Sequence, residues 1–415
     1  MTKMTKKLIA TVLVASMAAA GGVNAFAEEA AEDFSGVELS FWTAPFGEND
    51  QAFFEEKLAA WEERTGATVN VEVIPWDSYE EKYMTGVASG TGPDVGYMYN
   101  EMLYNYIESK AIQPIDEYFT DEEKANYIYW DNGKVLGEQY LLPYVVGAPR
   151  ILFCNMDLLA EAGYDAVPTT WDELVEVSKA IIEKTGKKGF DQPWGGYFGD
   201  LNEIYFTFLW QAGGAICDDE GNLTLDTEAA LKAAEFVYSL KTDGVISDSC
   251  VSRDSSAVAD DFRNGDVAMY IASSTGATKN TESGINWDYV PFTTDVTGGT
   301  FVANDSLVLM SGCENPEAAV SLMKELTSPE IMQAFHEDLY KMPPITTSET
   351  YVDDEKFEAM YSDSEIMSQF HALPVMKNFS QIESALYANL QQMMMDEMTP
   401  EEALQATMDY AASMG

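Results

Sequence analysis

Alternating and helical hydrophobic patterns succeed one another along the first hundred residues. Residues 36–45 alternate apolar and polar positions and stop at a proline, which predicts a strand followed by a loop. Residues 49–66 have apolar positions at helical spacing and end at a glycine suited to a helix C-cap. Residues 67–75 predict a second strand, 78–90 a second helix and 93–99 a third strand. This β-α-β-α-β order indicates a parallel sheet covered by helices.

The rest of the chain continues as mixed helices and strands. Residues 138–159 are extended and apolar with two prolines, which predicts two strands and a bend at a crossing between domains. Residues 258–273 predict a helix, a turn at Asn264 and Gly265, and a buried strand. Further helices are expected over residues 169–186, 226–244, 314–337 (broken at Pro329) and 399–414, and the chain from residue 361 is mostly helical.

Two of these helices carry capping signals. Thr170 with Glu173 three residues later predicts a capping box, and either Asp226 or Thr227 can cap the helix over 226–244. The aromatic stretch that begins at Tyr205 predicts a buried helix that stops at Gly213.

The length of 415 residues favours two domains, and a hydrophobic content of 46% supplies a large core. Residues 1–27 have three lysines, a short apolar run and a small-x-small site at 25–27, which predicts an export signal removed near Ala27. Its apolar run is too short to span a membrane. No cysteine follows the predicted site, so a lipid anchor is not expected.

The formal net charge of −47 disfavours nucleic acids and anionic lipid surfaces as partners, because both are themselves negative. Four cysteines, Cys154, Cys217, Cys250 and Cys313, allow three disulfide pairings, among which the sequence does not choose. Their wide spacing and the presence of only two histidines predict no metal site and no cofactor.

A series of motifs, taken in their order along the chain, resembles the extracellular solute-binding proteins of ABC sugar importers, the maltose-binding-protein-like family. The resemblance covers nearly the whole mature chain. The matching segments are residues 59–72, 90–95, 141–155, 167–176, 210–231, 262–271, 315–330, 342–344 and 399–404.

The resemblance implies an α/β fold of two lobes, with a hinge and a ligand cleft between them. It assigns residues 37–148 and 277–328 to one lobe, and 149–276 and 329–415 to the other. It further implies a monomeric, non-enzymatic receptor, exported to the periplasm or cell surface, that binds a carbohydrate and delivers it to the permease and ATPase of an importer.

Several candidate ligand-binding residues follow from the residues themselves. Ligands of parallel sheets bind beyond the carboxyl ends of the strands, where Trp42 and Trp76 each stand, with a core position as the alternative. Arg150 is a lone charge in an apolar stretch and serves either the ligand or a salt bridge across the lobe boundary. The end of the third strand adds Tyr99, Asn100 and Glu101 by the same strand-end argument. The glycine-rich loop at 193–200 adds its three aromatic residues, Trp194, Tyr197 and Phe198, which are expected to be exposed for ligand stacking.

The resemblance adds further candidates. It supports the third strand end, and it aligns Glu203 and Tyr205 with a sugar-contacting Glu-x-Tyr of relatives. Its remaining candidates are Ser274, Gly298, Gly299 and Phe379. Relatives often have tyrosine at Cys154 and an aromatic residue near Ser274, so the sugar specificity of any one relative does not transfer.

Three alternative functions remain open. A secreted glycosidase needs two carboxylates flanking one bond, but 70 acidic residues make chance pairs common and no glycosidase motif is visible. A surface adhesin predicts repeats or an anchor, and neither is visible in the sequence. A receptor for a non-sugar polar solute is the third alternative.

Overall fold

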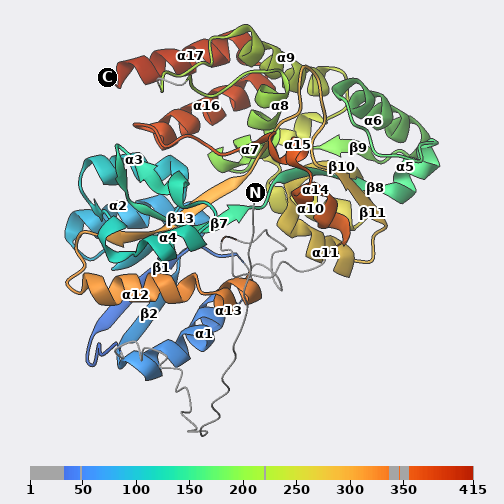
Figure 1. Ribbon diagram of the computed structural model, residues 1–415. Coiled ribbons are helices and arrows are strands. Elements are labelled where there is room, and N and C mark those ends of the chain that lie inside the picture. Colours follow the sequence, from blue (N-terminus) through green and yellow to red (C-terminus); the bar gives the residue numbers. More distant parts are fainter. Residues whose placement is uncertain (1–31, 47–48, 219–220, 336–344, 346–354, 415) are drawn as a thin grey trace, which may run out of the picture.

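The computed structural model of the chain consists of two α/β lobes joined by strands that cross between them (Figure 1). It describes residues 32–46, 49–218, 221–335, 345 and 355–414. The export signal expected over residues 1–27 therefore lies outside the described residues. Within the described part of the chain, no helix combines the length and apolar character needed to cross a membrane.

The first lobe is built on a six-stranded sheet in the order β2-β1-β3-β13-β4, with β7 also paired to β13. β1 runs parallel to β2 and β3, which confirms the parallel sheet expected from the sequence. β13 is antiparallel to β3, β4 and β7. The strands are β1 (Glu38–Thr43), β2 (Thr68–Val73), β3 (Val95–Met98), β4 (Ile112–Gln113), β7 (Leu141–Gly147) and β13 (Ala303–Met310), beside a hairpin of β5 (Lys134–Val135) and β6 (Glu138–Gln139).

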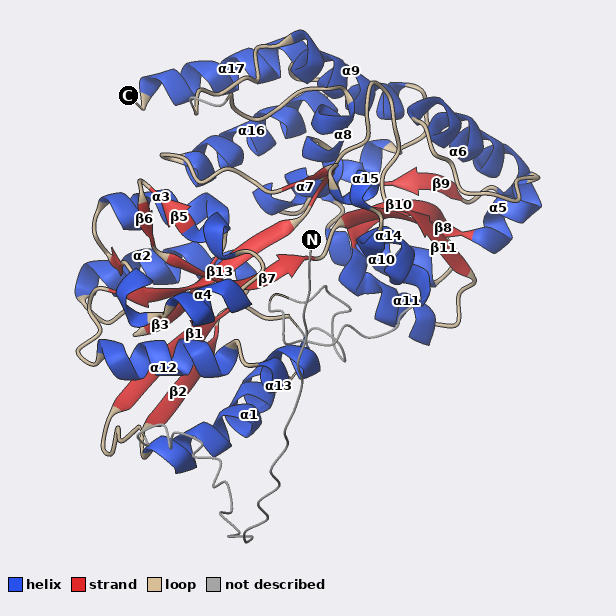
Figure 2. Ribbon diagram, viewed as in Figure 1, coloured by secondary structure: helices blue, strands red, loops and turns tan. Residues whose placement is uncertain are grey.

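Helices pack against this sheet (Figure 2). α1 buries Phe54, Leu58 and Trp61 and ends at Gly66, whose φ of 75° is the left-handed cap that the glycine predicted. The helices of this lobe are α1 (Asp50–Thr65), α2 (Tyr79–Ser89), α3 (Asn100–Glu108), α4 (Asp121–Asn126), α12 (Pro316–Leu326) and α13 (Pro329–Met332).

The second lobe is built on a four-stranded sheet in the order β11-β8-β10-β9. Its strands are β8 (Arg150–Asn155), β9 (Lys188–Asp191), β10 (Val267–Ser273) and β11 (Trp287–Val290). Its helices are α5 (Met156–Ala162), α6 (Trp171–Thr185), α7 (Leu201–Ile204), α8 (Phe206–Gln211), α9 (Glu228–Thr242), α10 (Ser255–Arg263), α11 (Ala277–Glu282), α14 (Glu355–Ser362), α15 (Ser364–Met367), α16 (Phe379–Met394) and α17 (Pro400–Ser413).

The lobes are connected by strands that pass between the two sheets. β7 belongs to the first sheet and β8 to the second, so the crossing lies at the bend predicted from the two prolines. Gly147 and Ala148 turn the chain there with φ of 136° and 50°. The return path runs through β12 (Thr300–Phe301), which pairs with β14 (Phe370–His371), into β13 beside β7. These adjacent crossing strands are the hinge of the two-lobed fold.

The lobe boundaries differ from those that the resemblance implied. Residues 277–328 were assigned to the first lobe, but β11 pairs with β8 in the second sheet and Ala277 packs in the second lobe's core cluster. Beyond residue 329, α13 contacts α12, and Phe335 packs on Phe54 of the first lobe. The chain therefore returns to the first lobe near residue 302, and Ile345 still belongs to it, since its carbonyl accepts from the Ile128 N–H at 2.9 Å.

The local predictions around the second-lobe helices are confirmed with one correction. α8 is buried throughout and Gly213 follows it with a φ of 80°. Thr227 caps α9, which decides between the two candidate caps. Thr170 caps α6, but the Glu173 carboxylate accepts from the Thr169 backbone N–H at 2.8 Å rather than from Thr170, so the expected capping box is not closed.

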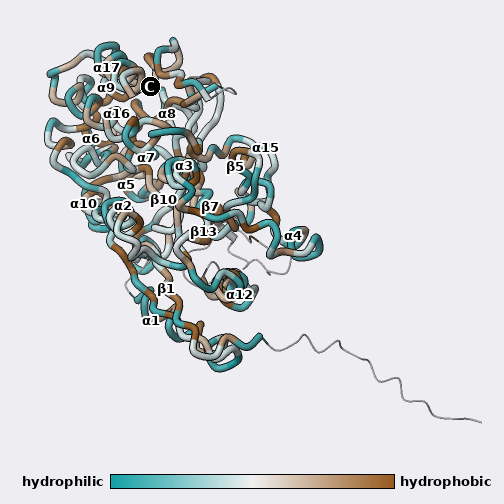
Figure 3. The backbone as a smooth tube through the Cα atoms, turned by 90° about the vertical axis from the view of Figure 1, so that its left-hand side faces the viewer, coloured by the Kyte–Doolittle hydropathy of each residue, from teal (hydrophilic) through white to brown (hydrophobic). Residues whose placement is uncertain are grey.

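Hydropathy follows this layered arrangement. Figure 3 shows hydrophobic residues along β1 in the interior and hydrophilic residues on α4 at the periphery. Cys154, Cys250 and Cys313 are buried thiols without a disulfide bond, so the core is held by packing at these positions.

Close packing of α6 on β9 gives a testable consequence. A Cβ added at Gly189 would lie 2.3 Å from the Ser178 carbonyl oxygen, so Gly189→Ala must push the helix from the strand. We expect a loss of about 1–3 kcal/mol in the free energy of unfolding, measured by urea denaturation. Gly312→Ala is the control, because no atom lies within 4 Å of its added Cβ. Equal stability of the two variants would contradict the close approach.

Candidate functional site

A cavity of about 370 Å³ lies between the two lobes, beside the crossing strands. This volume falls within the range of roughly 300–1,000 Å³ typical of small-molecule sites. Both lobes and the hinge contribute to its wall. The lining residues are Pro45, Phe46, Trp76, Asp77, Glu80, Glu81, Tyr97, Tyr99, Glu101, Val145, Ala148, Arg150, Tyr197, Phe198, Gly199, Asn202, Ser273, Thr275, Phe301, Ala303 and Asp305.

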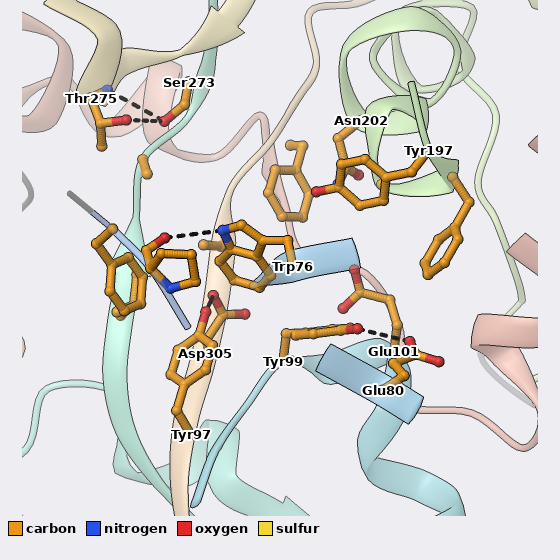
Figure 4. Close-up of a pocket in the computed structure, with 18 of the residues that line it drawn as sticks. Trp76, Glu80, Tyr97, Tyr99, Glu101, Tyr197, Asn202, Ser273, Thr275 and Asp305 are labelled. Carbon is orange, nitrogen blue, oxygen red and sulfur yellow. Dashed lines mark hydrogen bonds between the residues drawn. The ribbon is translucent and has the colours of Figure 1, made fainter. Parts of the chain in front are cut away.

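Aromatic rings from both lobes reach this cavity (Figure 4). Trp76 follows β2 and is fixed by an indole N–H donated to the Pro45 carbonyl at 3.0 Å and by a ring contact with Tyr99 at 6.0 Å. Tyr197 precedes α7 in the second lobe and packs on Phe198 at 5.7 Å. Trp76 is 37% exposed and Tyr197 48%, whereas large rings are usually buried. Both therefore keep surface available for a flat apolar partner.

Arg150 lies at the hinge end of the cavity, at the first residue of β8. Its Nε lies 3.1 Å from a carboxylate oxygen of Glu203 on α7, and its guanidinium lies 4.9 Å from the ring centre of Phe301. The guanidinium also donates to the Ala148 carbonyl at 3.1 Å. Arg150 forms a salt bridge, but the bridge lies within the second lobe, from β8 to α7, rather than across the lobe boundary as the sequence suggested. Arg150 also lines the cavity, so the pairing leaves a ligand role open to it.

Carboxylates from the first lobe line the opposite side. Asp305 on β13 accepts from the Tyr97 hydroxyl at 2.6 Å, and Glu80 on α2 accepts from the Tyr99 hydroxyl at 2.8 Å. Burial raises the pKa of Asp305 to about 7, although the Tyr97 hydroxyl and Arg150 oppose the rise. Burial likewise raises the pKa of Glu101, with the Asp305 charge adding to it. These groups hold protons more tightly than exposed carboxyls do.

Burial also raises the pKa of Glu203, while the neighbouring Arg150 charge lowers it. The ion pair therefore offsets part of the cost of placing a carboxyl group in the interior. It also holds α7 of the second lobe against the start of the crossing strand β8.

Six of the residues expected from the sequence line this cavity: Trp76, Tyr99, Glu101, Arg150, Tyr197 and Phe198. Glu203 stands behind Arg150 as its ion-pair partner. The strand-end rule led to Trp76, Tyr99 and Glu101, which line the cavity because β1, β2 and β3 are parallel and end at the same edge, but also to Trp42 and Asn100, which do not line it.

Other expected aromatic residues lie in the core, away from the cavity. Trp42 is buried against Tyr83 at 5.2 Å, and Tyr205 is fully buried with its hydroxyl donated to the Ala230 carbonyl at 3.1 Å. Phe379 begins α16 and is buried in the core. Trp194 was expected on an exposed loop, but it is fully buried because α16 covers it, with Tyr387 and Gln391 donating to its carbonyl.

The remaining expected residues also lie outside the lining. Asn100 is buried and donates to the Leu373 carbonyl at 2.8 Å. Ser274 is buried while its neighbours Ser273 and Thr275 line the cavity. A Cβ at Gly298 would meet the Phe292 ring and one at Gly299 the Trp210 side chain, so this glycine pair permits close packing within the second lobe.

The sequence reasoning missed several lining residues. Asp305 had a visible signal, since it is an acidic residue inside an otherwise buried strand. Glu80 lies one turn after Trp76, close to a predicted site residue. No sequence signal distinguished the others, of which Phe46, Tyr97 and Phe301 are the largest.

The described residues contain no group of three or more His, Cys, Asp or Glu side chains placed to hold a metal ion.

Comparisons with known proteins agree with this geometry. A family model described as bacterial extracellular solute-binding protein matches residues 47–333. A binding protein of Brucella abortus (strain 2308) is 28% identical over 289 residues, which cover 68% of this chain and 70% of that protein. An arabinooligosaccharide-binding protein of Halalkalibacterium halodurans is 29% identical over 223 residues, or 50% of this chain and 47% of that protein.

A solved structure resembles the whole molecule. The ABC transporter solute-binding protein of Thermotoga lettingae, bound with alpha-D-tagatose, superposes with a TM-score of 0.79 at 22% identity. The match covers 91% of this chain and 99% of that one. The two-lobed α/β fold expected from the sequence is thereby confirmed.

The buried carboxyl groups predict a pH dependence of stability. Raised pKa values in the folded state mean that the unfolded chain releases these protons more readily than the folded chain between about pH 4 and pH 8, so stability falls as the pH rises through that window. Glu383 on α16 is fully buried, and burial raises its pKa well above the ordinary value. Glu383→Gln should therefore flatten the decline measured by urea denaturation at pH 5 and pH 8.

The matched control for this experiment is Glu63→Gln, which removes the same charge from an exposed position on α1. It should leave the slope close to that of the parent protein. If both variants flatten the decline equally, general surface repulsion, not the buried carboxyl group, sets the pH dependence.

Because Trp194 is fully buried, we expect its side chain to contribute to the stability of the fold rather than to ligand binding. Trp194→Ala should lower the free energy of unfolding by about 3–5 kcal/mol, because it leaves a large cavity beneath α16. Urea denaturation measures this loss. An unchanged midpoint, combined with weakened ligand binding, would instead return Trp194 to the ligand site.

Proposed function

Because this chain belongs to the bacterial extracellular solute-binding protein family, we propose that it is a high-affinity extracytoplasmic receptor for a carbohydrate, and specifically for an oligosaccharide. The ligand occupies the interlobe cavity and is delivered to the permease and ATPase of an ABC importer. The receptor acts as a monomer after export and removal of residues 1–27.

The observation that carries the proposal is the pairing of exposed aromatic faces with buried polar groups in one cavity. Trp76 and Tyr197 come from different lobes, so a ring held between them is enclosed as the lobes close. A sugar presents C–H patches to such faces and hydroxyl groups to carboxylates and guanidinium groups. Exclusion of water strengthens these hydrogen bonds, and polar groups left unpaired penalise the wrong ligand.

The known relatives support the carbohydrate as ligand class. One relative binds arabinooligosaccharides by its name, and the superposed Thermotoga lettingae protein holds alpha-D-tagatose. We extend this ligand class to the present chain because its cavity offers the stacking and hydrogen-bonding groups that a sugar requires.

A secreted glycosidase is the alternative that the cavity carboxylates raise. Membership of a family of binding proteins favours binding without turnover. Prolonged incubation of each bound sugar with the protein should return it unchanged in chromatography. Appearance of shorter products would replace the receptor proposal with an enzyme.

The test of the proposal is a thermal-shift screen of residues 28–415 against mono-, di- and oligosaccharides, polyols, phosphorylated polyols, amino acids and peptides. A ligand that binds only the folded state raises the melting temperature. A shift with a carbohydrate supports the receptor reading. A shift only with peptides, amino acids or phosphorylated polyols would overturn the carbohydrate ligand while leaving the fold unaffected.

For the sugar that gives the largest shift, Trp76→Ala should weaken affinity in calorimetry by about 1–3 kcal/mol, the scale of one stacking contact. Tyr410→Ala on α17 is the matched control, since Tyr410 is similarly exposed at 41% and does not line the cavity. Equal affinities of Trp76→Ala and the control, with both proteins folded, would remove Trp76 from the site.

A further inference from the structure

The lining of the interlobe cavity is unbalanced in charge. Among the described residues that line it, the acidic members are Asp77, Glu80, Glu81, Glu101 and Asp305, whereas the one basic member is Arg150. That guanidinium is already engaged by Glu203, the Ala148 carbonyl and the Phe301 ring. Little of its charge is left to balance the carboxylates on the other side.

A further carboxyl group from the second lobe adds to this imbalance. Glu383 on α16 is fully buried, and neither of its carboxyl oxygens accepts a hydrogen bond from the described residues. The acidic groups that act on it most strongly are Glu101 and Glu80, both from the first lobe. One turn earlier on α16, Ser380 donates to both carboxylate oxygens of Glu80 at 2.8 and 2.7 Å.

Carboxyl groups from α2, α3 and α16 therefore lie near one another, with Glu80 and Glu101 in the cavity wall and Glu383 behind them. Mutual repulsion of like charges and loss of hydration both oppose this arrangement, and the pKa of Glu101 and Glu383 is raised accordingly. The available groups in this part of the wall are acceptors, since Glu80 already accepts from Tyr99 and Ser380. A partner suited to this part of the wall must donate hydrogen bonds and carry positive charge.

Resting on the proposed function, we propose that the carbohydrate ligand is an amino sugar, whose protonated amino group lies against Glu80 and Glu101 with Glu383 behind them. Its ammonium group supplies three donors and the missing positive charge. Its ring remains free to stack between Trp76 and Tyr197. Glu383 acts through the field it adds, and so is a positioning residue that does not touch the ligand.

This assignment predicts an order of affinities within matched sugars. An acidic sugar adds a negative charge beside these carboxyl groups, a neutral sugar leaves them protonated, and an amino sugar stabilises their ionised forms. The order should be amino, then neutral, then acidic. Preference for the amino sugar should also decline with added salt, because the interaction is between charges.

The experiment is isothermal titration calorimetry at about pH 7, where a sugar amine remains largely protonated. The pKa values of Glu101 and Asp305 are raised to about 8 and about 7, and an ammonium group bound beside these carboxyl groups favours their ionised forms. The matched sets are glucosamine, glucose and glucuronate; galactosamine, galactose and galacturonate; and chitobiose, cellobiose and diacetylchitobiose, the last set having an acetylated member in place of an acidic one. In each set that binds, we expect the sugar with the free amine to bind with at least about tenfold higher affinity than its neutral counterparts.

Variants then assign the effect to residues. Glu101→Gln should reduce the ratio of amine to neutral affinity about tenfold, and Glu383→Gln should reduce it less, since Glu383 acts at longer range. Glu63→Gln, the exposed control on α1, should leave the ratio unchanged. Should Glu101→Gln fail to fold, as judged by its melting curve, Glu383→Gln and the salt dependence decide the matter.

The outcomes separate this inference from the proposed function. Neutral or acidic sugars that bind as tightly as their amines would overturn the amino-sugar assignment and leave the carbohydrate receptor intact. If Glu383→Gln has the same ratio of amine to neutral sugar affinity as the parent protein, the amino-sugar assignment is likewise overturned and the carbohydrate receptor is left intact. Absence of binding by every carbohydrate, here and in the thermal-shift screen, would overturn both.

Discussion

The ion pair of Arg150 and Glu203 is the interaction on which the ligand site depends. It joins the first residue of a crossing strand to a helix of the second lobe, at the point where the chain passes between sheets. Removing either partner leaves the other charge buried and unpaired, which is strongly unfavourable. Arg150 also moderates the raised pKa of Asp305 and Glu101, so its position sets how much negative charge the cavity can hold.

The two lobes supply different parts of the site because the chain passes between them and each lobe contributes separate elements. Parallel strands of the first lobe end together and present Trp76, Tyr99 and Glu101, while the second lobe adds Tyr197 and brings Glu383 close behind. Neither lobe alone encloses a ligand. A ligand that contacts both lobes therefore favours the closed arrangement by its difference in affinity between closed and open states.

The sequence predicted the fold and a minority of the residues that line the cavity, for identifiable reasons. Strand ends and a lone charge in an apolar stretch are local signals, and the residues they indicated include four that line the cavity: Trp76, Tyr99, Glu101 and Arg150. Trp194 was placed wrongly on an exposed loop because α16, nearly 200 residues later, covers it. Glu383 was missed for the same reason, since long-range packing alone brings it to the first-lobe carboxylates, whereas Asp305 had a local signal as an acidic residue within a largely buried strand.

Closure of the two lobes on a bound sugar is the central claim, and small-angle X-ray scattering tests it most directly. The radius of gyration of residues 28–415 would be measured without ligand and with a saturating concentration of the sugar that gives the largest thermal shift. Closure predicts a smaller radius of gyration in the ligand-bound protein. An unchanged or larger radius at proven saturation would contradict closure around an interlobe ligand.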